Sequence, residues 1–363
     1  MPSPRIIPLG NRHNYYMNIV RCIALILVLC ISPVAFASAA DGIHEDISVT
    51  IIGDSAPIIR KGGSVTIVHP NEDGIPNIQT AILRNMNDDI LNDSVDLFTN
   101  PKRRHKFFQA ALVRSAQYIK MVQGIFKVAG LPEPLAWLPL IESEYSPYAV
   151  SQASAVGMWQ FMEGTGKRYG LRVDKYIDER RDPRKSTLAA AAYLKDLYEQ
   201  MKDLYPSDSD GKRWRAVLMS YNAGENKIIR VQQKCALTGK DLLNNKEIPL
   251  ETKRYPHLMI VALTIKDSPE EYGFKKAEQT SEPEYKTYII NQGKKKGAAL
   301  LDINIFAKKC RVKAKEMREL NPAITGDWLP PYEYRLILPE RAVLPVIAME
   351  TKSNKRHPKE RTY

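Results

Sequence analysis

The 363-residue chain lacks the short motifs that carry several common enzyme chemistries. It has no G-x-x-x-x-G-K-[ST] phosphate loop, no G-x-G-x-x-G dinucleotide motif, no H-E-x-x-H zinc motif and no G-x-S-x-G nucleophile elbow. Its six histidines are scattered without the spacing of metal ligands. Nucleotide, metal and serine-nucleophile chemistry therefore lack support, and we expect no cofactor, no metal and no nucleic-acid partner.

Cysteine is also scarce, with four residues and no C-x-x-C pair. Cys22 and Cys30 fall within a predicted export signal, which leaves Cys235 and Cys310. Two cysteines so far apart in sequence do not make a disulfide framework, even in an oxidising compartment. We expect them to be buried thiols, and whether they pair stays open.

The N-terminus has the pattern of an export signal. Arg21 precedes an apolar run over residues 23–37, and the small residues Ala37-Ser38-Ala39 offer a cleavage point. The run is shorter than the ~20 residues that span a bilayer, which favours cleavage, with a retained anchor as the alternative. The sequence thus predicts a signal peptide over residues 1–40 and a periplasmic or cell-envelope location.

The charge balance is basic, with a formal net charge of +12. Part of the excess lies in the last residues, 341–363, and such a tail is most often a solvated end. The functional alternative is weak attraction to a membrane surface or another anionic polymer of the envelope.

The length of the chain predicts two or three domains. Residues 41–101 read as a β-hairpin, formed by "ISVTIIG" and "SVTIVHP" around "RKGG", followed by a helical connector. Residues 102–273 are rich in helical patterns, residues 274–284 resemble a linker, and residues 285–340 alternate strand, helix and strand. The predicted fold class is therefore mainly α, with a small α+β module at residues 285–340.

Several helix boundaries within residues 102–273 carry sequence signals. From Lys106 the apolar residues recur at helical spacing as far as Gly130, which is a predicted helix stop. Ser186 is the predicted N-cap of an Ala-rich helix, and Gly224 is the predicted end of another.

Glu142 is a single acid in apolar surroundings, directly after "WLPLI". Pro132 and Pro134 suit a first helical turn and "SPY" breaks regular structure, so Glu142 is predicted near a helix C-terminus. The apolar neighbours and the helix dipole both disfavour its charge and raise its pKa. A carboxyl group that is still protonated near neutral pH can act as a general acid. A lone Glu at a helix end is most often a surface residue. The hypothesis of a catalytic acid therefore depends on the motifs that accompany Glu142.

Polar groups interleaved with aromatic residues accompany this acid. Sugars present apolar ring faces edged with hydroxyls and amides, so such a set suits a sugar-binding groove. Each of the aromatic residues, taken alone, is more often a core residue. Besides Ser143, the set comes from "GMWQF" and "SYNAG" and comprises Trp159, Gln160, Phe161, Tyr221 and Asn222.

The motifs "ESEY", "GMWQFM" and "YNAG", in this order, resemble the signature of the lytic murein transglycosylases. The further stretches "LPEPLAWLPLIES", "DERRDP" and "ETKRY" are most similar to the transglycosylase D branch, and the resemblance covers residues 102–273. It implies a lysozyme-like fold of the goose-type and soluble lytic transglycosylase kind. It also implies cleavage of the bond between N-acetylmuramic acid and N-acetylglucosamine in the glycan strands of peptidoglycan.

The resemblance implies that Glu142 is the single catalytic acid and base. The muramoyl C6 hydroxyl then attacks C1 and gives a 1,6-anhydro end. Such an intramolecular nucleophile needs no second carboxylate to activate water. The substrate-binding roles implied by the resemblance fall on Ser143, Met158, Trp159, Gln160, Phe161, Tyr221, Asn222 and Tyr255.

Some positions depart from the pattern of the family. Ser154 stands where the family usually has Gly, and Pro256-His257 follows Tyr255 where the family tends to have Val-Pro, which puts the role of Tyr255 in doubt. The segment with "LNPAI" and "YRLILP" is similar to a degenerate LysM module, but "NQGKKKGAAL" lacks the usual Gly-Asp-Thr turn. Glycan binding and a purely structural role both stay open for this segment.

The sequence thus predicts a periplasmic lytic transglycosylase that acts on peptidoglycan as a monomer. One alternative is a goose-type lysozyme, in which water replaces the C6 hydroxyl. The other is a non-catalytic scaffold that binds peptidoglycan.

Overall fold

The computed structural model describes residues 47–51, 58–61, 66–67, 88–98, 105–205, 210–239, 241–277, 285–290 and 300–343. Within this part of the chain the fold is mainly helical, with a small two-stranded sheet near the C-terminus, as predicted. None of the described helices is long and apolar enough to cross a membrane. The predicted signal over residues 1–40 and the tail beyond residue 343 lie outside the described residues.

The chain divides into two compact units. Unit 1 comprises Met1–Tyr145 and Ala191–Glu278, and unit 2 comprises Ser146–Ala190 and Gln279–Tyr363. The long helix α7 (Pro183–Leu204) carries the chain from unit 2 back into unit 1. The domain ranges predicted above stay a prediction.

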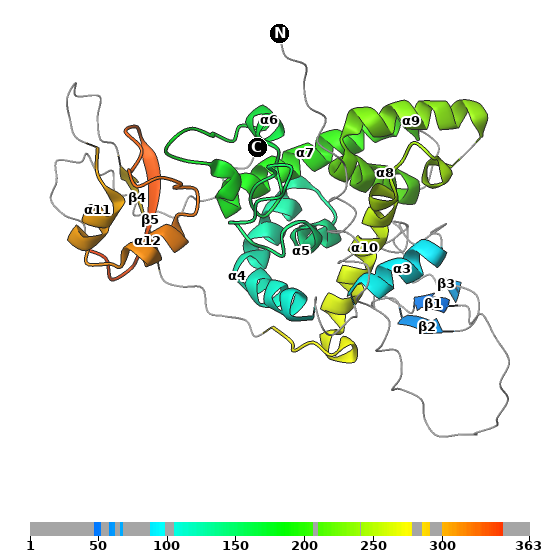
Figure 1. Cartoon of the computed structure of the whole chain (residues 1–363), viewed down its shortest axis with the longest axis horizontal. Coiled ribbons are helices and arrows are strands. Elements are labelled where there is room, and N and C mark those ends of the chain that lie inside the picture. Colours follow the sequence, from blue (N-terminus) through cyan, green and yellow to red (C-terminus); the bar gives the residue numbers. More distant parts are fainter. Residues whose placement is uncertain are drawn as a thin grey trace, which may run out of the picture. The chain divides into compact units, whose positions relative to one another are not determined.

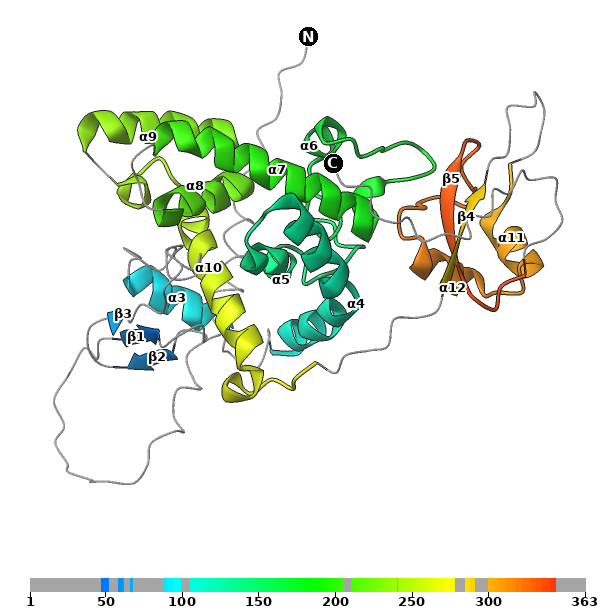
Figure 2. The same ribbon diagram turned by 180° about the vertical axis from the view of Figure 1, so that it is seen from behind.

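Unit 1 is built around α10 (Leu250–Asp267). Every residue from Met259 to Ile265 is buried, so this helix is enclosed on all sides. Helix α3 lies alongside α10 in both views (Figures 1 and 2). The other helical elements of the unit are α3 (Asp88–Phe98), α4 (His105–Ala129), η1 (Glu133–Trp137), α5 (Pro139–Glu142), α8 (Asp210–Ala223), α9 (Glu225–Thr238), η3 (Leu242–Asn244) and η4 (Pro269–Tyr272).

The predicted helix stops at Gly130 and Gly224 are confirmed, because α4 and α8 end at the residues before them. Both glycines have a positive φ, of 70° and 86°, which L side chains rarely adopt. The turn after α4 returns the chain to η1, whose first residues carry the predicted helix-starting prolines.

The N-cap predicted at Ser186 is wrong. Helix α7 begins earlier, at Pro183, because Asp182 accepts the backbone N–H groups of Arg184 and Lys185, each at 2.9 Å. Pro183 has no N–H to satisfy and fits a first helical position. The hydroxyl of Ser186 instead donates to the Asp182 carbonyl at 2.6 Å, inside the first turn.

The N-terminal hairpin exists with a different partner from the one predicted. Strand β1 (Ile47–Ile51) pairs antiparallel with β2 (Ile58–Lys61), whose "IIRK" includes the first residues of the predicted turn. Strand β3 (Thr66–Ile67), from the predicted second strand, pairs parallel with β1, which gives the order β2-β1-β3. The glycines of "RKGG" therefore follow the hairpin instead of forming its turn.

Unit 2 contains a sheet of β4 (Tyr285–Ile290) and β5 (Tyr334–Pro339), paired antiparallel with Ile290 opposite Tyr334. Between these strands lie α11 (Ile303–Lys309) and α12 (Ala314–Leu320), which confirms the predicted strand, helix and strand order. Buried apolar side chains of these elements form one core, which also includes Ile177 from the N-terminal part of the unit. The remaining elements of unit 2 are α6 (Glu163–Arg168) and η2 (Glu179–Arg181).

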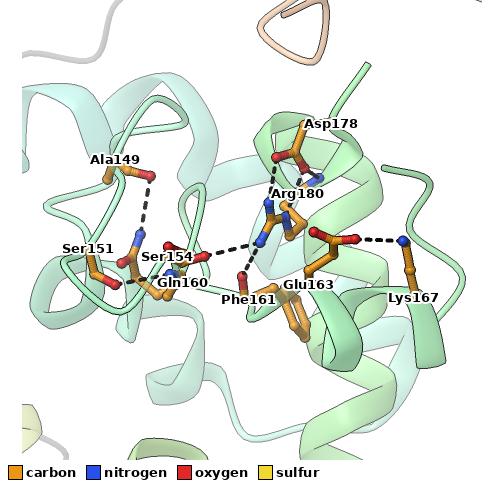
Figure 3. A network of polar contacts seen from close by, with 10 residues as sticks. Ala149, Ser151, Ser154, Gln160, Phe161, Glu163, Lys167, Asp178 and Arg180 are labelled. Atoms are coloured by element: carbon orange, nitrogen blue, oxygen red, sulfur yellow. Dashed lines mark hydrogen bonds and ion pairs between the residues drawn. The ribbon is translucent and has the colours of Figure 1, made fainter. Parts of the chain in front are cut away.

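The buried guanidinium of Arg180 ties together the loop over residues 154–161, which contains "GMWQF" (Figure 3). Its nitrogens donate to Asp178 at 2.7 and 2.9 Å and to the carbonyls of Ser154 at 3.3 Å and Phe161 at 3.1 Å. A buried charge requires such partners, because removing it from water without them is costly. Gly157 lies against the backbone of Arg180, where an added Cβ would stand 1.8 Å from the Arg180 carbonyl oxygen.

We expect Gly157→Ala to lower the free energy of unfolding by about 3 kcal/mol or more, because it combines a positive φ with a clash against backbone. Gly170→Ala is the matched control, because Gly170 has the same φ of +83° with no atom within 4 Å of the added Cβ. It isolates the backbone strain, which costs about 1–2 kcal/mol. Urea unfolding of both variants measures the difference, and equal losses would contradict the close packing at Gly157.

Ser154 has φ 65°, which explains why a glycine suits this position in the family that the chain resembles. We expect Ser154→Gly to raise the free energy of unfolding by about 0.5 kcal/mol, because relief of strain exceeds the added freedom of the unfolded chain. The backbone carbonyl that bonds Arg180 is retained. A loss of stability in the same urea assay would show that the serine side chain has a stabilising role.

Candidate active site

Glu142 is the last residue of α5, as predicted, and the chain reverses directly after it. Glu144 and Tyr145 both have a positive φ, of 55° and 58°, and Tyr145 is bonded through its hydroxyl to the Ala136 carbonyl. Arg114 of α4 donates to the Glu144 carbonyl at 2.8 Å and to its carboxylate at 3.2 Å. These contacts fix the backbone that carries the Glu142 side chain.

The carboxyl group of Glu142 accepts a hydrogen bond from the Tyr255 hydroxyl. Tyr255 is a buried residue of α10, so the two partners come from elements far apart in the sequence. Pro256, which departs from the pattern of the family, lies inside the same helix and does not prevent the contact between Tyr255 and Glu142. Proline lacks the N–H that would bond the Thr252 carbonyl one turn earlier. Whether Tyr255 contacts substrate stays a prediction.

The pKa of Glu142 is raised from 4.5 to about 7, mainly by burial and to a smaller extent by the nearby charge of Glu251. The hydrogen bond from Tyr255 acts in the opposite direction, because it favours the ionised form. Glu142 is partly buried as a residue, and its carboxyl group is poorly hydrated. Near neutral pH such a group can both give and take a proton.

Tyrosine hydroxyls gather around this acid. Tyr221, on α8, packs its ring against that of Tyr193, on α7, at 5.4 Å between centroids. Burial and the charge of Glu142 raise the pKa of Tyr221 and of Tyr255 well above 10. Both phenols therefore stay protonated and remain hydrogen-bond donors at any physiological pH.

Sequence reasoning missed Tyr193 and Glu225. The Tyr193 hydroxyl donates to the Glu225 carboxylate at 3.0 Å, which links α7 to the start of α9. The available signals were weak. Tyr193 directly follows a run of four alanines, and Glu225 directly follows "YNAG".

Asn222 lies next to Tyr221, and its side-chain carbonyl accepts a hydrogen bond from the Thr252 hydroxyl at 2.9 Å. This contact orients the amide between α8 and α10. Ser143 is nearly buried beside the acid, with its hydroxyl 3.5 Å from the Pro139 carbonyl. The neighbouring His257 is held neutral, because burial lowers its pKa to about 4.

The predicted site residues of "GMWQF" belong to unit 2, whereas Glu142 and its tyrosine partners belong to unit 1. The Trp159 indole donates to the Thr187 hydroxyl at 2.9 Å, and the Gln160 amide donates to the Gly157 carbonyl at 2.8 Å. Substrate contact stays a prediction for this motif. Three of its side chains are buried and at most 2 % exposed, namely Met158, Trp159 and Phe161.

The part of the chain that the structure describes holds no group of three or more His, Cys, Asp or Glu side chains placed to bind a metal ion. Cys235 and Cys310 are both buried free thiols, as expected from their apolar surroundings.

Comparison with known proteins gives the site a context. Residues 126–243 match the family model described as the Transglycosylase SLT domain. The chain is 28 % identical over 172 residues to membrane-bound lytic murein transglycosylase D of Escherichia coli (strain K12), covering 47 % of this chain and 36 % of that protein. It is 31 % identical over 138 residues to membrane-bound lytic murein transglycosylase F of Maricaulis maris, covering 35 % of this chain and 28 % of that protein.

A third relative is membrane-bound lytic murein transglycosylase C of Edwardsiella ictaluri, 32 % identical over 124 residues, which cover 32 % of this chain and 34 % of that protein. The chain thus spans about a third of the length of these curated relatives. The matched segment contains Glu142, the "GMWQF" motif, Tyr193, Tyr221 and Asn222. Over residues 126–243 the chain is therefore similar to the Transglycosylase SLT domain, and the three relatives named above are lytic murein transglycosylases.

Proposed function

We propose that this protein is a peptidoglycan lytic transglycosylase, with Glu142 as its catalytic acid and base. The enzyme cleaves the β-1,4 bond between N-acetylmuramic acid and N-acetylglucosamine without water and leaves a 1,6-anhydro end. The observation that supports this most directly is the Glu142 carboxyl group, which lies within the segment that matches the SLT domain, has a pKa of about 7 and is bonded to Tyr255.

In the first step, protonated Glu142 donates its proton to the glycosidic oxygen, and the bond from C1 of the muramoyl residue to that oxygen breaks. A pKa of about 7 leaves a large fraction of the group protonated at neutral pH. The carboxylate that forms is stabilised by the hydrogen bond that Tyr255 already donates.

In the second step, the Glu142 carboxylate takes the proton of the muramoyl C6 hydroxyl, and that oxygen bonds to C1. Atoms balance without water, and the acid returns to its starting form. Because the nucleophile belongs to the substrate, its proximity supplies much of the rate. A second carboxylate, which hydrolytic glycosidases need to activate water or attack the sugar, has no task here.

The remaining polar groups would bind the substrate. We propose that the Asn222 amide, the Ser143 hydroxyl and the Gln160 amide recognise N-acetyl or hydroxyl groups. The Tyr221 phenol would donate a hydrogen bond near the reacting oxygens. We also propose that Met158, Trp159 and Phe161 line the groove that binds the sugar.

The setting of the enzyme follows from its substrate. Peptidoglycan lies in the cell envelope, so the proposal includes export through the N-terminal segment and action as a monomer on glycan strands. Weak attraction of the basic chain to the membrane or to other anionic envelope polymers is part of the same proposal.

We expect Glu142→Gln to reduce release of soluble fragments from purified sacculi at least ~10³-fold, because the variant has no proton to give or take. Wild-type digests should contain 1,6-anhydromuramoyl ends by mass spectrometry. The control is Glu251→Gln, which removes the other charge that acts on Glu142 and leaves the acid in place. That variant should keep most of the activity.

Other products would favour the other functions. Reducing muramoyl ends, heavier than anhydro ends by one water, would indicate a lysozyme. Full activity of Glu142→Gln would contradict the assignment of the acid. A wild-type protein that binds sacculi without cutting them would be the scaffold.

The raised pKa of Glu142 also predicts a pH-dependent stability. A carboxyl group whose pKa is higher folded than unfolded stabilises the fold at low pH, and this contribution is lost as pH rises from 4.5 through about 7. Glu142→Gln removes the titration. Its free energy of unfolding, relative to that of the wild type, should therefore rise by up to about 3 kcal/mol between pH 4 and pH 8. Urea unfolding at both pH values measures this, and an unchanged difference would show that Glu142 is not desolvated.

A further inference from the structure

The C-terminal module (residues 285–290 and 300–343) shares its hydrophobic core with a segment of the SLT domain, residues 171–182, here called the docking segment. Ile177 of the docking segment is 1 % exposed and lies in the same buried cluster as the module's own core. The fully buried members of that cluster on the module side are Ile290, Ile303, Ala307, Cys310, Met317, Leu329, Leu336 and Leu338. A side chain buried this way ties the segment to the module by a large apolar contact.

Backbone and side-chain hydrogen bonds reinforce this contact. The N–H of Asp178 donates to the Ala323 carbonyl at 2.8 Å, and the N–H of Thr325 donates to the Tyr176 carbonyl at 3.1 Å. These two bonds join the docking segment to the module in the manner of a short sheet edge, next to the Ile177 and Ile324 bridge. Separation would leave the N–H of Asp178 and the carbonyl of Ala323, both in buried residues, without partners, which is costly.

Tyr332 of the module makes a third kind of contact. Its hydroxyl donates to the Asp174 carboxylate at 2.6 Å. The Arg172 guanidinium lies over its ring at 3.4 Å from the centroid, and the Tyr176 ring meets it edge on. An appendage that only tethers the enzyme to glycan needs none of these contacts with the catalytic domain.

The docking segment leads directly to the loop over residues 154–161. Asp178, whose backbone is bonded to the module, also holds the Arg180 guanidinium through its carboxylate. Arg180 in turn donates to the Ser154 and Phe161 carbonyls at the two ends of that loop (Figure 3). The module, Asp178, Arg180 and the loop thus form one continuous set of contacts.

We propose that the C-terminal module is a positioning element of the enzyme, which holds the loop over residues 154–161 in place through Asp178 and Arg180. Its significance for catalysis rests on the proposed function, since Gln160 of this loop is a proposed substrate contact. The partner of the docking segment is therefore the protein's own C-terminal module. The module would have this positioning role whether or not it also binds glycan.

The test uses the full chain with Ile177→Ala, which removes most of the buried side chain, and measures amide hydrogen exchange by NMR. Ile305→Ala is the matched control, because Ile305 is an exposed isoleucine of the module. We expect exchange at Asp178 and Thr325 to accelerate about tenfold or more in Ile177→Ala and not in the control. The amides of Val156, Gly157 and Phe161, which are hydrogen-bonded within unit 2, should accelerate with them.

The exchange experiment tests the docking and the positioning role separately. Acceleration at Asp178 and Thr325 with unchanged exchange in the loop would overturn the positioning role. Unchanged exchange at all of these amides would overturn the assignment of Ile177 as the anchor. If Ile177→Ala fails to fold, Tyr332→Phe serves instead, because it removes only the hydrogen bond to Asp174. The same amides should then exchange faster than in the wild type, by a smaller factor than expected for Ile177→Ala.

Activity separates positioning from glycan tethering. On a short soluble glycan fragment, Ile177→Ala should lower kcat severalfold. The reason is that the variant no longer holds the loop over residues 154–161, with its proposed substrate contact Gln160, in the position needed for the reaction. A module that only tethers would change KM on sacculi and leave kcat on the short fragment unaltered, and that result would overturn the proposal. If neither wild type nor variant cleaves glycan, the proposed function fails, while the exchange data still decide the docking.

Discussion

The proposed chemistry depends on one constraint, which is that the carboxyl group of Glu142 is poorly hydrated and yet hydrogen-bonded to a neutral donor, the Tyr255 hydroxyl. Burial raises the pKa of Glu142 to about 7, which makes it a usable acid, and the Tyr255 hydrogen bond keeps the ionised form accessible. Helix α10 supplies this partner, and Tyr255 is buried together with most of the residues that follow it in the helix. The single helical turn of α5 and the reversed backbone after it present the acid at a fixed point.

A second desolvated charge organises unit 2. Arg180 is 6 % exposed, and the cost of burying its charge is offset by two hydrogen bonds that it donates to the Asp178 carboxylate and by those it donates to the Ser154 and Phe161 carbonyls. The loop with Gly157 can only close on Arg180 because a glycine stands there. The buried ion pair between Arg180 and Asp178 thus stabilises the loop over residues 154–161, which carries proposed substrate contacts.

The sequence predicted what depends on local pattern. The helix ends at Gly130 and Gly224, the placement of Glu142 and its raised pKa follow from nearby residues and are found in the structure. The start of α7 was misplaced at Ser186, because two competing caps stood within four residues and only backbone geometry selects Asp182. The hairpin partner was also wrong, since register between short apolar runs is weakly specified. The Tyr193 to Glu225 contact and the shared core around Ile177 join distant segments, which one sequence does not reveal.

Tyrosines, instead of cationic side chains, around Glu142 suit its proposed role as a proton donor. A cation beside Glu142 would stabilise the carboxylate and lower its pKa out of the range in which it can donate. A phenol donates a hydrogen bond without carrying a charge, and burial, with the charge of Glu142 as a second cause, raises the pKa of Tyr221 and Tyr255 further above the range in which they would ionise. The hydrogen bond from Tyr255 favours the Glu142 carboxylate by less than burial disfavours it, so the pKa of Glu142 stays near 7 and the group can both give and take a proton.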